Sequence, residues 1–217
     1  MLFITQKAKE RVVVTPAFIQ QINADVMKQT GSIYQTVFGE LDAGKGVFRR
    51  GNVSAGNTYF VGYEKVEPLV KKLCNGINEK IISGSSLIEK LNICFDAHFD
   101  LVTIHPFYDG NGRTSRLLMN YLQLYFNLPL SIVFKEDKAA YFEALQQTSK
   151  EEDITIFQKF MYGQYAKYLQ LEIEKFEQAQ QEQKKRSWLF VCILIHLLLL
   201  QHHRFLQIGK HFFIHFF

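Results

Sequence analysis

One short stretch of the chain, His105 to Arg116, contains most of the side chains that could do chemistry. It carries an imidazole at His105, a carboxylate at Asp109 and guanidinium groups at Arg113 and Arg116. An imidazole can act as a general base near neutral pH, and carboxylate oxygens bind hard divalent cations. Arginine forms paired hydrogen bonds with phosphate oxygens. This combination predicts a site for a phosphorylated ligand, and we expect a nucleoside triphosphate.

The residues before this stretch predict a helix that ends at it. Apolar residues recur at helical spacing between Leu87 and Val102. Pro106 disfavours helical geometry at the residue before it, so the helix should end near His105. The Asp-Gly and Asn-Gly pairs that follow tolerate left-handed backbone, and they predict a tight turn.

A second helix should begin at this turn, because helical apolar spacing resumes at Leu117 and continues to Leu124. The first backbone amides of a helix lack intrahelical acceptors and lie at the positive end of its dipole. They therefore predict an anion site in the loop. Arg113 and Arg116 are three residues apart, so both lie on one face of the first turn and add positive charge.

Two other structures share parts of this pattern. An Asn-Gly pair is typical of a β-hairpin turn, but the flanking residues show helical spacing and no strand alternation. Asp-Gly-Asn-Gly also occurs in calcium loops, but the position that needs a carboxylate in such a loop is Asn120 here. The helix–turn–helix interpretation accounts for more of the residues.

The stretch resembles the signature of the Fic family, His-Pro-Phe-x-(Asp/Glu)-Gly-Asn-Gly-Arg-x-x-Arg, and every specified position is filled. The resemblance implies a protein adenylyltransferase, which transfers AMP from ATP to a Ser, Thr or Tyr hydroxyl of a target protein. It implies that His105 is the general base and that Asp109 holds a Mg²⁺ ion. The residues implied to bind the nucleotide here are Asp109, Gly110, Asn111, Gly112, Arg113, Thr114, Ser115 and Arg116.

The same resemblance implies an all-α fold, a Fic-type helical bundle with a small β-hairpin flap. The helices that flank the signature should form its centre. Ser86 and Glu89 predict a capping box at the start of the first of them. Further helices are expected at residues 15–30, 66–82, 138–147 and 154–169, with a short helix or turn at 33–38.

The segment 44–63 mixes glycine, Asn and Ser with Val and aromatic residues, and it predicts an irregular hairpin with strands at 47–49 and 59–61. Gly46-Val47-Phe48-Arg49 resembles the Fic segment Gly-x-Phe-Arg, which introduces the flap. The resemblance implies a flap that lies over the active site and binds the target protein by strand addition. An ordinary surface hairpin is the alternative. The implied nucleotide-side tip is Ala55, Gly56, Asn57 and Thr58.

An aromatic pair, Tyr141 and Phe142, lies where Fic proteins commonly place aromatic residues against the base of the nucleotide. The alternative is that both are core aromatics. His98 precedes His105 by about two helical turns, and we expect it to be a packing residue and not a second base.

Length and composition place this site in one domain with appendages. The chain has 217 residues and a net charge of +4, spread without a basic and aromatic stripe for nucleic acid. Its three cysteines are odd in number and widely spaced, so neither disulfides nor zinc is expected, and no secretory signal is evident. We therefore expect a cytoplasmic protein. The division is a segment at 1–14, a Fic domain at 15–169, a charged helical extension at 170–186 and an apolar tail at 187–217.

The tail leaves three alternatives open. Residues 187–217 contain no Asp, Glu or Asn, and the apolar run at 188–200 is shorter than the ~20 residues that span a bilayer. The tail could contact a membrane surface after the basic residues 184–186, mediate oligomerisation, or be an out-of-frame translation without selected structure. Its composition favours the last alternative.

The mode of control is predicted from a missing motif. Fic proteins are commonly restrained by an inhibitory helix, (Ser/Thr)-x-x-x-Glu-(Gly/Asn), whose glutamate pairs with the arginine equivalent to Arg116. Glu40 and Glu152 follow a threonine at this spacing, but the next residues are Leu41 and Asp153. The sequence therefore predicts an enzyme that is active without release. Any restraint is expected to come from an antitoxin-like partner or from a segment outside this sequence.

Two alternatives to AMP transfer also stay open. Fic relatives can transfer UMP, phosphocholine or phosphate with the same loop, because contacts to phosphate do not identify the base. A non-catalytic protein that binds nucleotide, or a remnant of a longer gene, is the other alternative.

Overall fold

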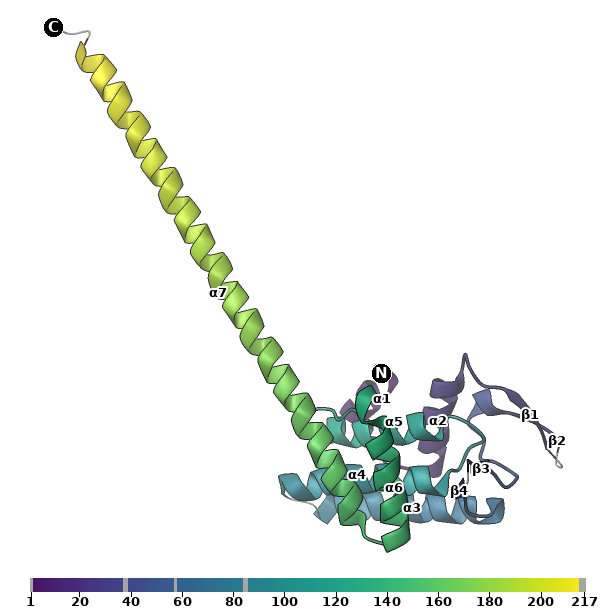
Figure 1. The fold of residues 1–217 in the computed structure, drawn as a ribbon. Helices are drawn as coiled ribbons and strands as arrows, with labels where there is room; N and C mark the ends of the chain where they lie inside the picture. The colour runs from purple at the N-terminus through teal and green to yellow at the C-terminus, as the bar shows by residue number, and fades with distance from the viewer. Residues whose placement is uncertain (1, 37–38, 57, 84–85, 215–217) are drawn as a thin grey trace. The chain divides into compact units, whose positions relative to one another are not determined.

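In the computed structural model, the backbone is described for residues 2–36, 39–56, 58–83 and 86–214. The chain divides into two compact units, Met1–Tyr168 and Leu169–Phe217. The first unit holds six whole helices among its described residues and the beginning of a seventh (Figure 1). This agrees with the expected all-α fold.

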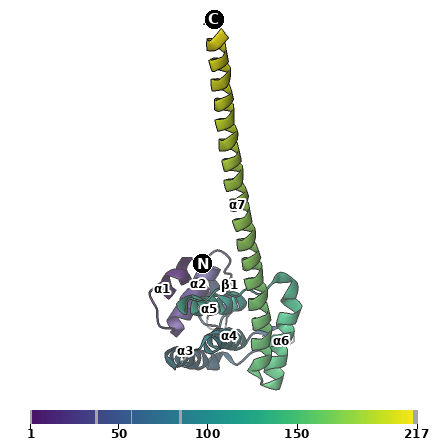
Figure 2. The same ribbon diagram turned by 90° about the vertical axis from the view of Figure 1, so that its left-hand side faces the viewer.

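Two helices form the centre of the first unit, α4 (Leu87–Ile104) and α5 (Asn111–Tyr125). They pack against each other, and α5 also packs against α1 (Leu2–Lys9) and α2 (Pro16–Met27), as Figure 2 shows. On its other side α4 packs against α3 (Val66–Ser83). Burial of apolar side chains drives this packing, and the fully buried residues of the pair include Phe95, Leu101, Leu118 and Leu122.

The ends of these helices follow from local sequence. The side chain of Thr15 accepts a hydrogen bond from the Phe18 amide at the start of α2. Both halves of the capping box between Ser86 and Glu89 are present, so that prediction is confirmed. At its C-terminus α4 stops because His105 has left-handed backbone geometry, with φ 54°, and is followed by Pro106.

Two further helices complete the bundle. One is α6 (Lys138–Glu151), and the other is α7 (Ile154–Ile214), whose residues up to Tyr168 belong to the first unit. Aromatic contacts join them to α4, with ring centroids 5.4 Å apart between Phe99 and Phe157. Short 3-10 turns lie at Ala43–Lys45, Tyr63–Lys65 and Lys135–Asp137.

Two small antiparallel hairpins project from the helices. In one, β1 (Ile33–Thr36) pairs with β2 (Gly39–Asp42), so that Ile33 faces Asp42 and Thr36 faces Gly39. In the other, β3 (Ser54–Ala55) pairs with β4 (Thr58–Tyr59).

The first hairpin corrects the expected helix or turn at 33–38. Residues 33–36 form a strand with alternating exposure, and Gly39 supplies a positive φ of 98° beyond residues 37–38, which lie outside the described residues. Ile-Tyr-Gln-Thr is rich in β-branched and aromatic residues, and this preference outweighed the weak helical spacing.

The second hairpin corrects the expected strands at 47–49 and 59–61. The paired residues are 54–55 and 58–59, because the segment around Arg49 is engaged elsewhere. The Arg49 amide donates to the Pro106 carbonyl at 2.9 Å, and the Arg49 side chain is buried. A tertiary contact with the loop between α4 and α5 therefore replaced the strand pairing.

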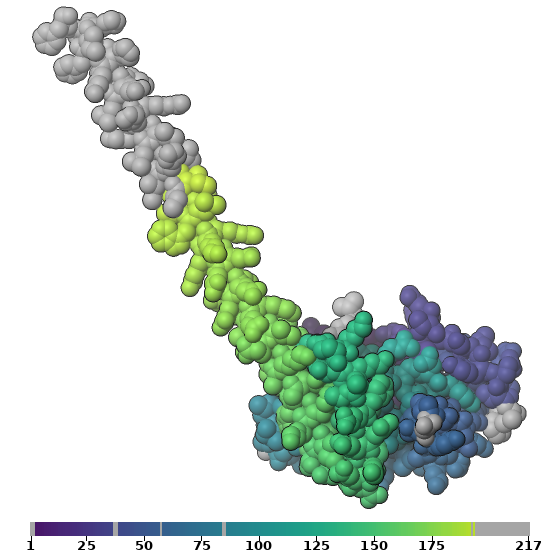
Figure 3. Space-filling view, in the orientation of Figure 1, coloured from purple at the N-terminus to yellow at the C-terminus, as the bar shows by residue number. Residues whose placement is uncertain are grey.

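The second unit consists of the remainder of α7. Every side chain from 170 to 191 is exposed, as Figure 3 shows for this part of the helix. No helix among the described residues is long and apolar enough to cross a membrane.

This arrangement predicts that the first unit folds without the tail. A chain that ends at Arg186 should unfold in a single thermal transition at the same temperature as the full chain, because the removed residues lie outside the first unit and those whose burial is described, 187–191 and 193, are exposed. Circular dichroism at 222 nm measures this. As a matched contrast, a chain that ends at Lys159 loses the buried residues Met161 and Tyr165 and should unfold without cooperativity. A lower melting temperature for the Arg186 chain would place the tail in the core.

Candidate active site

A cavity of about 380 Å³ lies where the end of α4, the start of α5 and the start of α6 meet, and we call it the α5 pocket. Most of the residues proposed from the sequence line it, namely His105, Asp109, Gly110, Asn111, Gly112, Arg113, Arg116, Tyr141 and Phe142. Three residues that the sequence did not single out also line it, Val102, Tyr108 and Lys138.

The structure does not bring every proposed residue to the α5 pocket. Ala55, Gly56 and Thr58 belong to the β3–β4 hairpin and do not line it, and Asn57 lies outside the described residues. The side chains of Thr114 and Ser115 are fully buried. Their hydroxyls donate to the carbonyls of Gly110, at 2.9 Å, and Gly112, at 3.1 Å. These two side chains therefore fix the first turn of α5.

The loop between α4 and α5 is held by the side chain of Asn111. Its Oδ1 accepts from the Phe107 amide at 2.9 Å, and its Nδ2 donates to the Phe107 carbonyl at 2.8 Å. Phe107 is 2% exposed, so its ring anchors the loop in the core. Both polar groups of a buried amide are satisfied, and the loop has one defined conformation.

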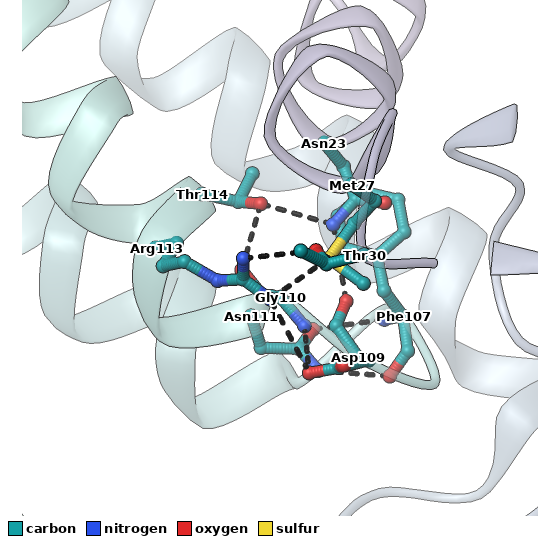
Figure 4. A network of polar contacts seen from close by, with 9 residues as sticks. All are labelled: Asn23, Met27, Thr30, Phe107, Asp109, Gly110, Asn111, Arg113 and Thr114. Atoms are coloured by element: carbon teal, nitrogen blue, oxygen red, sulfur yellow. Dashed lines mark hydrogen bonds and ion pairs between the residues drawn. The ribbon is translucent and has the colours of Figure 1, made fainter. Parts of the chain in front are cut away.

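Asn23 of α2 also forms hydrogen bonds that support the loop, as Figure 4 shows. Nδ2 of Asn23 donates to the Asp109 carbonyl at 3.1 Å and to Oγ1 of Thr114 at 3.0 Å. Asn23 is 1% exposed and lies among the apolar residues of its helix. A buried polar residue on an apolar helix face needs a partner, and this was the sequence clue to its role.

Gly110 is required where it stands. Its φ is 78°, and a Cβ atom there would lie 2.7 Å from Sδ of Met27 and 2.9 Å from Nδ2 of Asn23. A side chain would therefore be strained, and it would displace the side chains of Met27 and Asn23.

Arg113 lies at the edge of the α5 pocket. Its guanidinium donates to Oγ1 of Thr30 at 3.2 Å and to Sδ of Met27 at 3.0 Å, and is 3.8 Å from Oδ1 of Asp109 (Figure 4). Both side chains of this ion pair are more than two-fifths exposed, so the pair contributes little to stability and can rearrange around a ligand.

The first turn of α5 offers the expected anion site. The first intrahelical bond runs from the Thr114 amide to the Gly110 carbonyl at 2.8 Å. The amides of residues 111–113 precede that bond, so they lie at the positive end of the helix. A Cβ added to Gly112 would lie 3.5 Å from a terminal nitrogen of Arg116. The Arg116 guanidinium therefore folds back over the same turn.

The imidazole of His105 has a defined orientation. Its Nδ1 lies 3.2 Å from the Val102 carbonyl, and its ring stacks on Phe60 with centroids 3.7 Å apart. A carbonyl oxygen only accepts hydrogen bonds, so Nδ1 carries the proton and Nε2 keeps its lone pair. Burial lowers the pKa of His105, while the Val102 carbonyl and the charge of Asp109 oppose that shift. The geometry suits a general base.

Arg49 joins the loop to the hairpin segment, and sequence analysis named it only as part of the flap motif. It is 2% exposed. Its side chain donates to the carbonyls of His105, at 2.8 Å, of Gly51, at 2.8 Å, and of Val61. One buried cation thus fixes the position of Phe60, which lies next to Val61, against the imidazole.

The two aromatic residues of α6, Tyr141 and Phe142, differ in burial. Tyr141 is 4% exposed and its hydroxyl lies 2.9 Å from Nε2 of His98, whereas Phe142 is 50% exposed. His98 is fully buried, which agrees with the expected packing role. Only Phe142 offers an open ring face, and Lys138 lies 5.9 Å from its centroid.

The first hairpin also contacts the loop. Tyr34 of β1 stacks on Tyr108, with ring centroids 5.0 Å apart. Neither glutamate with the spacing of an inhibitory motif lines the α5 pocket. Glu40 lies in β2 and accepts from Gln35 at 2.9 Å, and Glu152 follows α6 with a φ of 54°. Asp109 is the one carboxylate among the described residues that line the pocket.

Comparisons with known proteins agree with this geometry. A family model described as Fic/DOC family matches residues 13–123. Protein adenylyltransferase Fic of Drosophila melanogaster is 33% identical over 149 residues, which is 68% of this chain and 29% of that protein. The chain therefore spans less than a third of the length of this relative.

Solved structures share the fold. A Fic domain containing signaling protein from Bacteroides thetaiotaomicron has a TM-score of 0.67 at 23% identity, over 79% of this chain and 66% of that one. A Fic-1 fragment from C. elegans has a TM-score of 0.62 at 22% identity, over 79% of this chain and 46% of that one. With the complete signature and a family match over half of its length, the chain belongs to the Fic/DOC family.

Proposed function

We propose that this chain transfers AMP from ATP to a Ser, Thr or Tyr hydroxyl of a target protein. One observation carries the proposal: Nε2 of His105, with a free lone pair, borders the same pocket as the amide turn and Arg116. A base and an anion site in one cavity are what nucleotidyl transfer to a hydroxyl needs. The relative reported above is named a protein adenylyltransferase, which supports the choice of AMP.

In this proposal Nε2 of His105 takes the proton of the target hydroxyl, while the oxygen of that hydroxyl attacks the α-phosphorus of ATP. The bond between that phosphorus and the bridging oxygen to the β-phosphate breaks, and pyrophosphate leaves. Arg116 and the amides of residues 111–113 stabilise the negative charge on the phosphates. Because burial lowers the pKa of His105, the imidazole is neutral near pH 7 and ready to accept the proton.

Asp109 would hold the Mg²⁺ ion. Its side chain is 49% exposed at the pocket edge, with one oxygen accepting from the Gly110 amide at 2.5 Å. The described residues contain no group of three or more His, Cys, Asp or Glu side chains that could cage a metal. A single carboxylate suits Mg²⁺, which commonly binds one protein ligand together with substrate phosphates and water. Bound there, the ion would neutralise phosphate charge.

The β3–β4 hairpin would bind the target protein as an added strand. Its four paired residues, 54–55 and 58–59, are all exposed, and Tyr59 is 87% exposed. A two-stranded sheet leaves outward-facing backbone groups on both edges, which an extended segment can pair with. The Arg49 bonds hold this hairpin near His105, so a paired segment would present its hydroxyl to the imidazole.

We also propose a cytoplasmic location and control by an antitoxin-like partner. Cys74 and Cys94 are free and buried, which suits a reducing compartment. The arrangement around Arg116 supports control in trans, because the one carboxylate among the described lining residues belongs to the loop itself.

Substitutions at the base and the metal ligand should have separable effects. His105→Ala should reduce protein labelling from ATP by roughly 10²- to 10⁴-fold and leave the Kd for ATP unchanged, because only proton transfer is lost. Asp109→Asn should abolish the dependence of ATP affinity on Mg²⁺. Labelling with α-phosphate-labelled ATP in a lysate, and calorimetry with and without Mg²⁺, measure these effects.

Asp153→Asn is the matched control for Asp109→Asn. Asp153 is an exposed carboxylate outside the pocket, and its Oδ1 accepts a hydrogen bond from the Thr155 amide at the start of α7. If the His105→Ala variant labels protein at the same rate as the unsubstituted chain, His105 is not the general base. An Asp109→Asn chain with intact Mg²⁺ dependence would contradict the metal assignment.

The pKa of His105 provides a direct electrostatic test. In the chain without nucleotide it should lie below the ordinary value of 6.5, because burial disfavours the imidazolium. Asp109→Asn should lower it further, since the negative charge of Asp109 stabilises the imidazolium. NMR titration of the imidazole, assigned by its loss in His105→Ala, measures both values. A pKa above 6.5, or a rise on Asp109→Asn, would contradict this account.

The isolated chain should modify itself when given ATP and Mg²⁺. Neither Glu40 nor Glu152 lines the α5 pocket, so Glu40→Gly and Glu152→Gly should leave the rate of self-labelling unchanged. Autoradiography of the purified chain and both variants measures this. If the unmodified chain is silent and either substitution activates it, an inhibitor is built into the chain and control in trans is wrong.

A further inference from the structure

Another cavity of the first unit, of about 430 Å³, lies between α4 and the turn that joins α6 to α7, and we call it the acidic pocket. Its described lining residues include three carboxylates, Asp96, Asp100 and Glu152, and no Lys, Arg or His. It shares no lining residue with the α5 pocket. The steps proposed above therefore do not use this cavity.

The three carboxylates differ in their partners. Oδ2 of Asp96 lies 3.1 Å from Nζ of Lys80, and its Oδ1 accepts from Nε2 of Gln158 at 2.7 Å. Asp100 and Glu152 form no ion pair with another described residue. Partial removal from water, together with the charge of Asp96, raises the pKa of Asp100 to about 6. Two carboxylates of one cavity would therefore be stabilised by a cation.

A buried hydroxyl also borders the acidic pocket. Thr148 lines the cavity and is 2% exposed, and its Oγ1 has no hydrogen-bond partner among the described residues. A Ser or Thr within a helix can bond the carbonyl four residues earlier, as Ser149 does with Leu145 at 3.0 Å. Thr148 forms no such bond. A buried hydroxyl without a partner is unfavourable, so a ligand in the cavity that donates to it would supply what is missing.

The acceptors and the walls indicate the chemical class of that ligand. The described residues contain no group of three or more His, Cys, Asp or Glu side chains that could hold a metal ion, so the three carboxylates are not a metal site. A primary ammonium has three N–H donors, enough for two carboxylates and one hydroxyl. Phe99 and Ile154 also line the cavity, and an aliphatic chain can pack against them.

We propose that the acidic pocket binds an aliphatic primary ammonium group, whose charge pairs with Asp100 and Glu152 and which donates to the Thr148 hydroxyl. A lysine side chain of another protein and a free aliphatic amine present this same chemistry. The backbone at Glu152 supports the proposal. Glu152 ends α6 with a φ of 54°, where helices most often place glycine, so a carboxylate stands there against backbone preference.

Calorimetry of the full chain with n-butylamine, without nucleotide, tests the proposal. Butylamine has the ammonium group and the carbon chain of a lysine side chain. Physiological ionic strength screens weak attraction to surface charges, so a specific site is distinguished from them. Tetramethylammonium carries the same charge and no donors, and we expect it to bind at least roughly 10-fold more weakly.

Thr148→Val separates binding from folding. Valine has the shape of threonine and no hydroxyl, so the variant should raise the melting temperature of the ligand-free chain and weaken butylamine binding roughly 10-fold. Ser149→Ala is the matched control. Ser149 lines the same cavity, but its hydroxyl already bonds the Leu145 carbonyl, so this variant should keep its affinity for butylamine. Circular dichroism measures the melting temperatures.

Substitutions of the carboxylates test the charges. Asp100→Asn and Glu152→Gln should each weaken butylamine binding roughly 10-fold, because each removes one charged acceptor. Asp153→Asn is the matched control. Asp153 is adjacent to Glu152 in sequence and does not line the acidic pocket, so this variant should bind butylamine like the unsubstituted chain.

Two further ligands distinguish the sources of the ammonium group. Diaminobutane, with an ammonium at each end, should bind more tightly than butylamine if the natural ligand is a free amine that reaches both carboxylates. A short lysine peptide with blocked termini should bind more tightly than butylamine if the natural ligand is a protein side chain. Either result supports the pocket as an ammonium site.

Four results would overturn the proposal. They are no binding of butylamine to the unsubstituted chain, equal affinities for butylamine and tetramethylammonium, unchanged butylamine affinity in Thr148→Val, and equal losses in Asp153→Asn and Glu152→Gln. None of these measurements involves ATP. A chain that binds butylamine as expected but never labels protein would therefore retain the ammonium site and refute only the proposed AMP transfer.

Discussion

The buried guanidinium of Arg49 is the interaction on which the candidate site depends. It donates to carbonyls at the end of α4, at Gly51 and at Val61, while its own backbone amide donates to Pro106. A buried charge is stable only when its donors find acceptors, so these carbonyls are held where the guanidinium requires them. The consequence is that His105, the proposed general base, and the hairpin proposed to receive the target share one anchor.

That anchor also supports an unfavourable backbone. His105 is not glycine and yet has a φ of 54°, a conformation that costs about 1–2 kcal/mol for most residues. The left-handed turn ends α4 abruptly and directs the imidazole to the Val102 carbonyl on one side and the Phe60 ring on the other. The backbone geometry therefore sets the orientation of the imidazole, and the contact with the Val102 carbonyl places the proton on Nδ1 and leaves Nε2 as the proposed base.

A second constraint is that α5 must begin with its first amides unoccupied. The buried side-chain amides of Asn23 and Asn111 form hydrogen bonds with the loop backbone at Asp109 and Phe107. The loop therefore does not need the first backbone amides of α5 for its own stability. The positive end of α5 remains available to a ligand, with Arg116 above it. Stability of the loop and readiness of the anion site thus come from different groups, since Asn111 uses its side chain for the loop and its backbone amide for the anion site.

Local sequence determined the central helices and their turn, because caps, Pro106 and the Asp-Gly-Asn-Gly stretch act within a few residues of one another. Ser86 and Glu89 form the predicted capping box, and α4 ends at the predicted residue. The complete signature also placed His105, Asp109 and Arg116 at one site, and the structure brings them to one pocket. Short-range chemistry was sufficient for these predictions.

Only the tertiary structure decided which segments meet that loop. The hairpin strands were misplaced because Arg49 bonds a loop some fifty residues away, and no local pattern reports such a contact. Asn23, Phe60 and Tyr34 reach the site from separate elements. The pair Tyr141 and Phe142 is adjacent in sequence, yet one ring is buried against His98 and the other is exposed. Neighbouring residues on a helix point in different directions, so the packing of α6 on α4 set their separate roles.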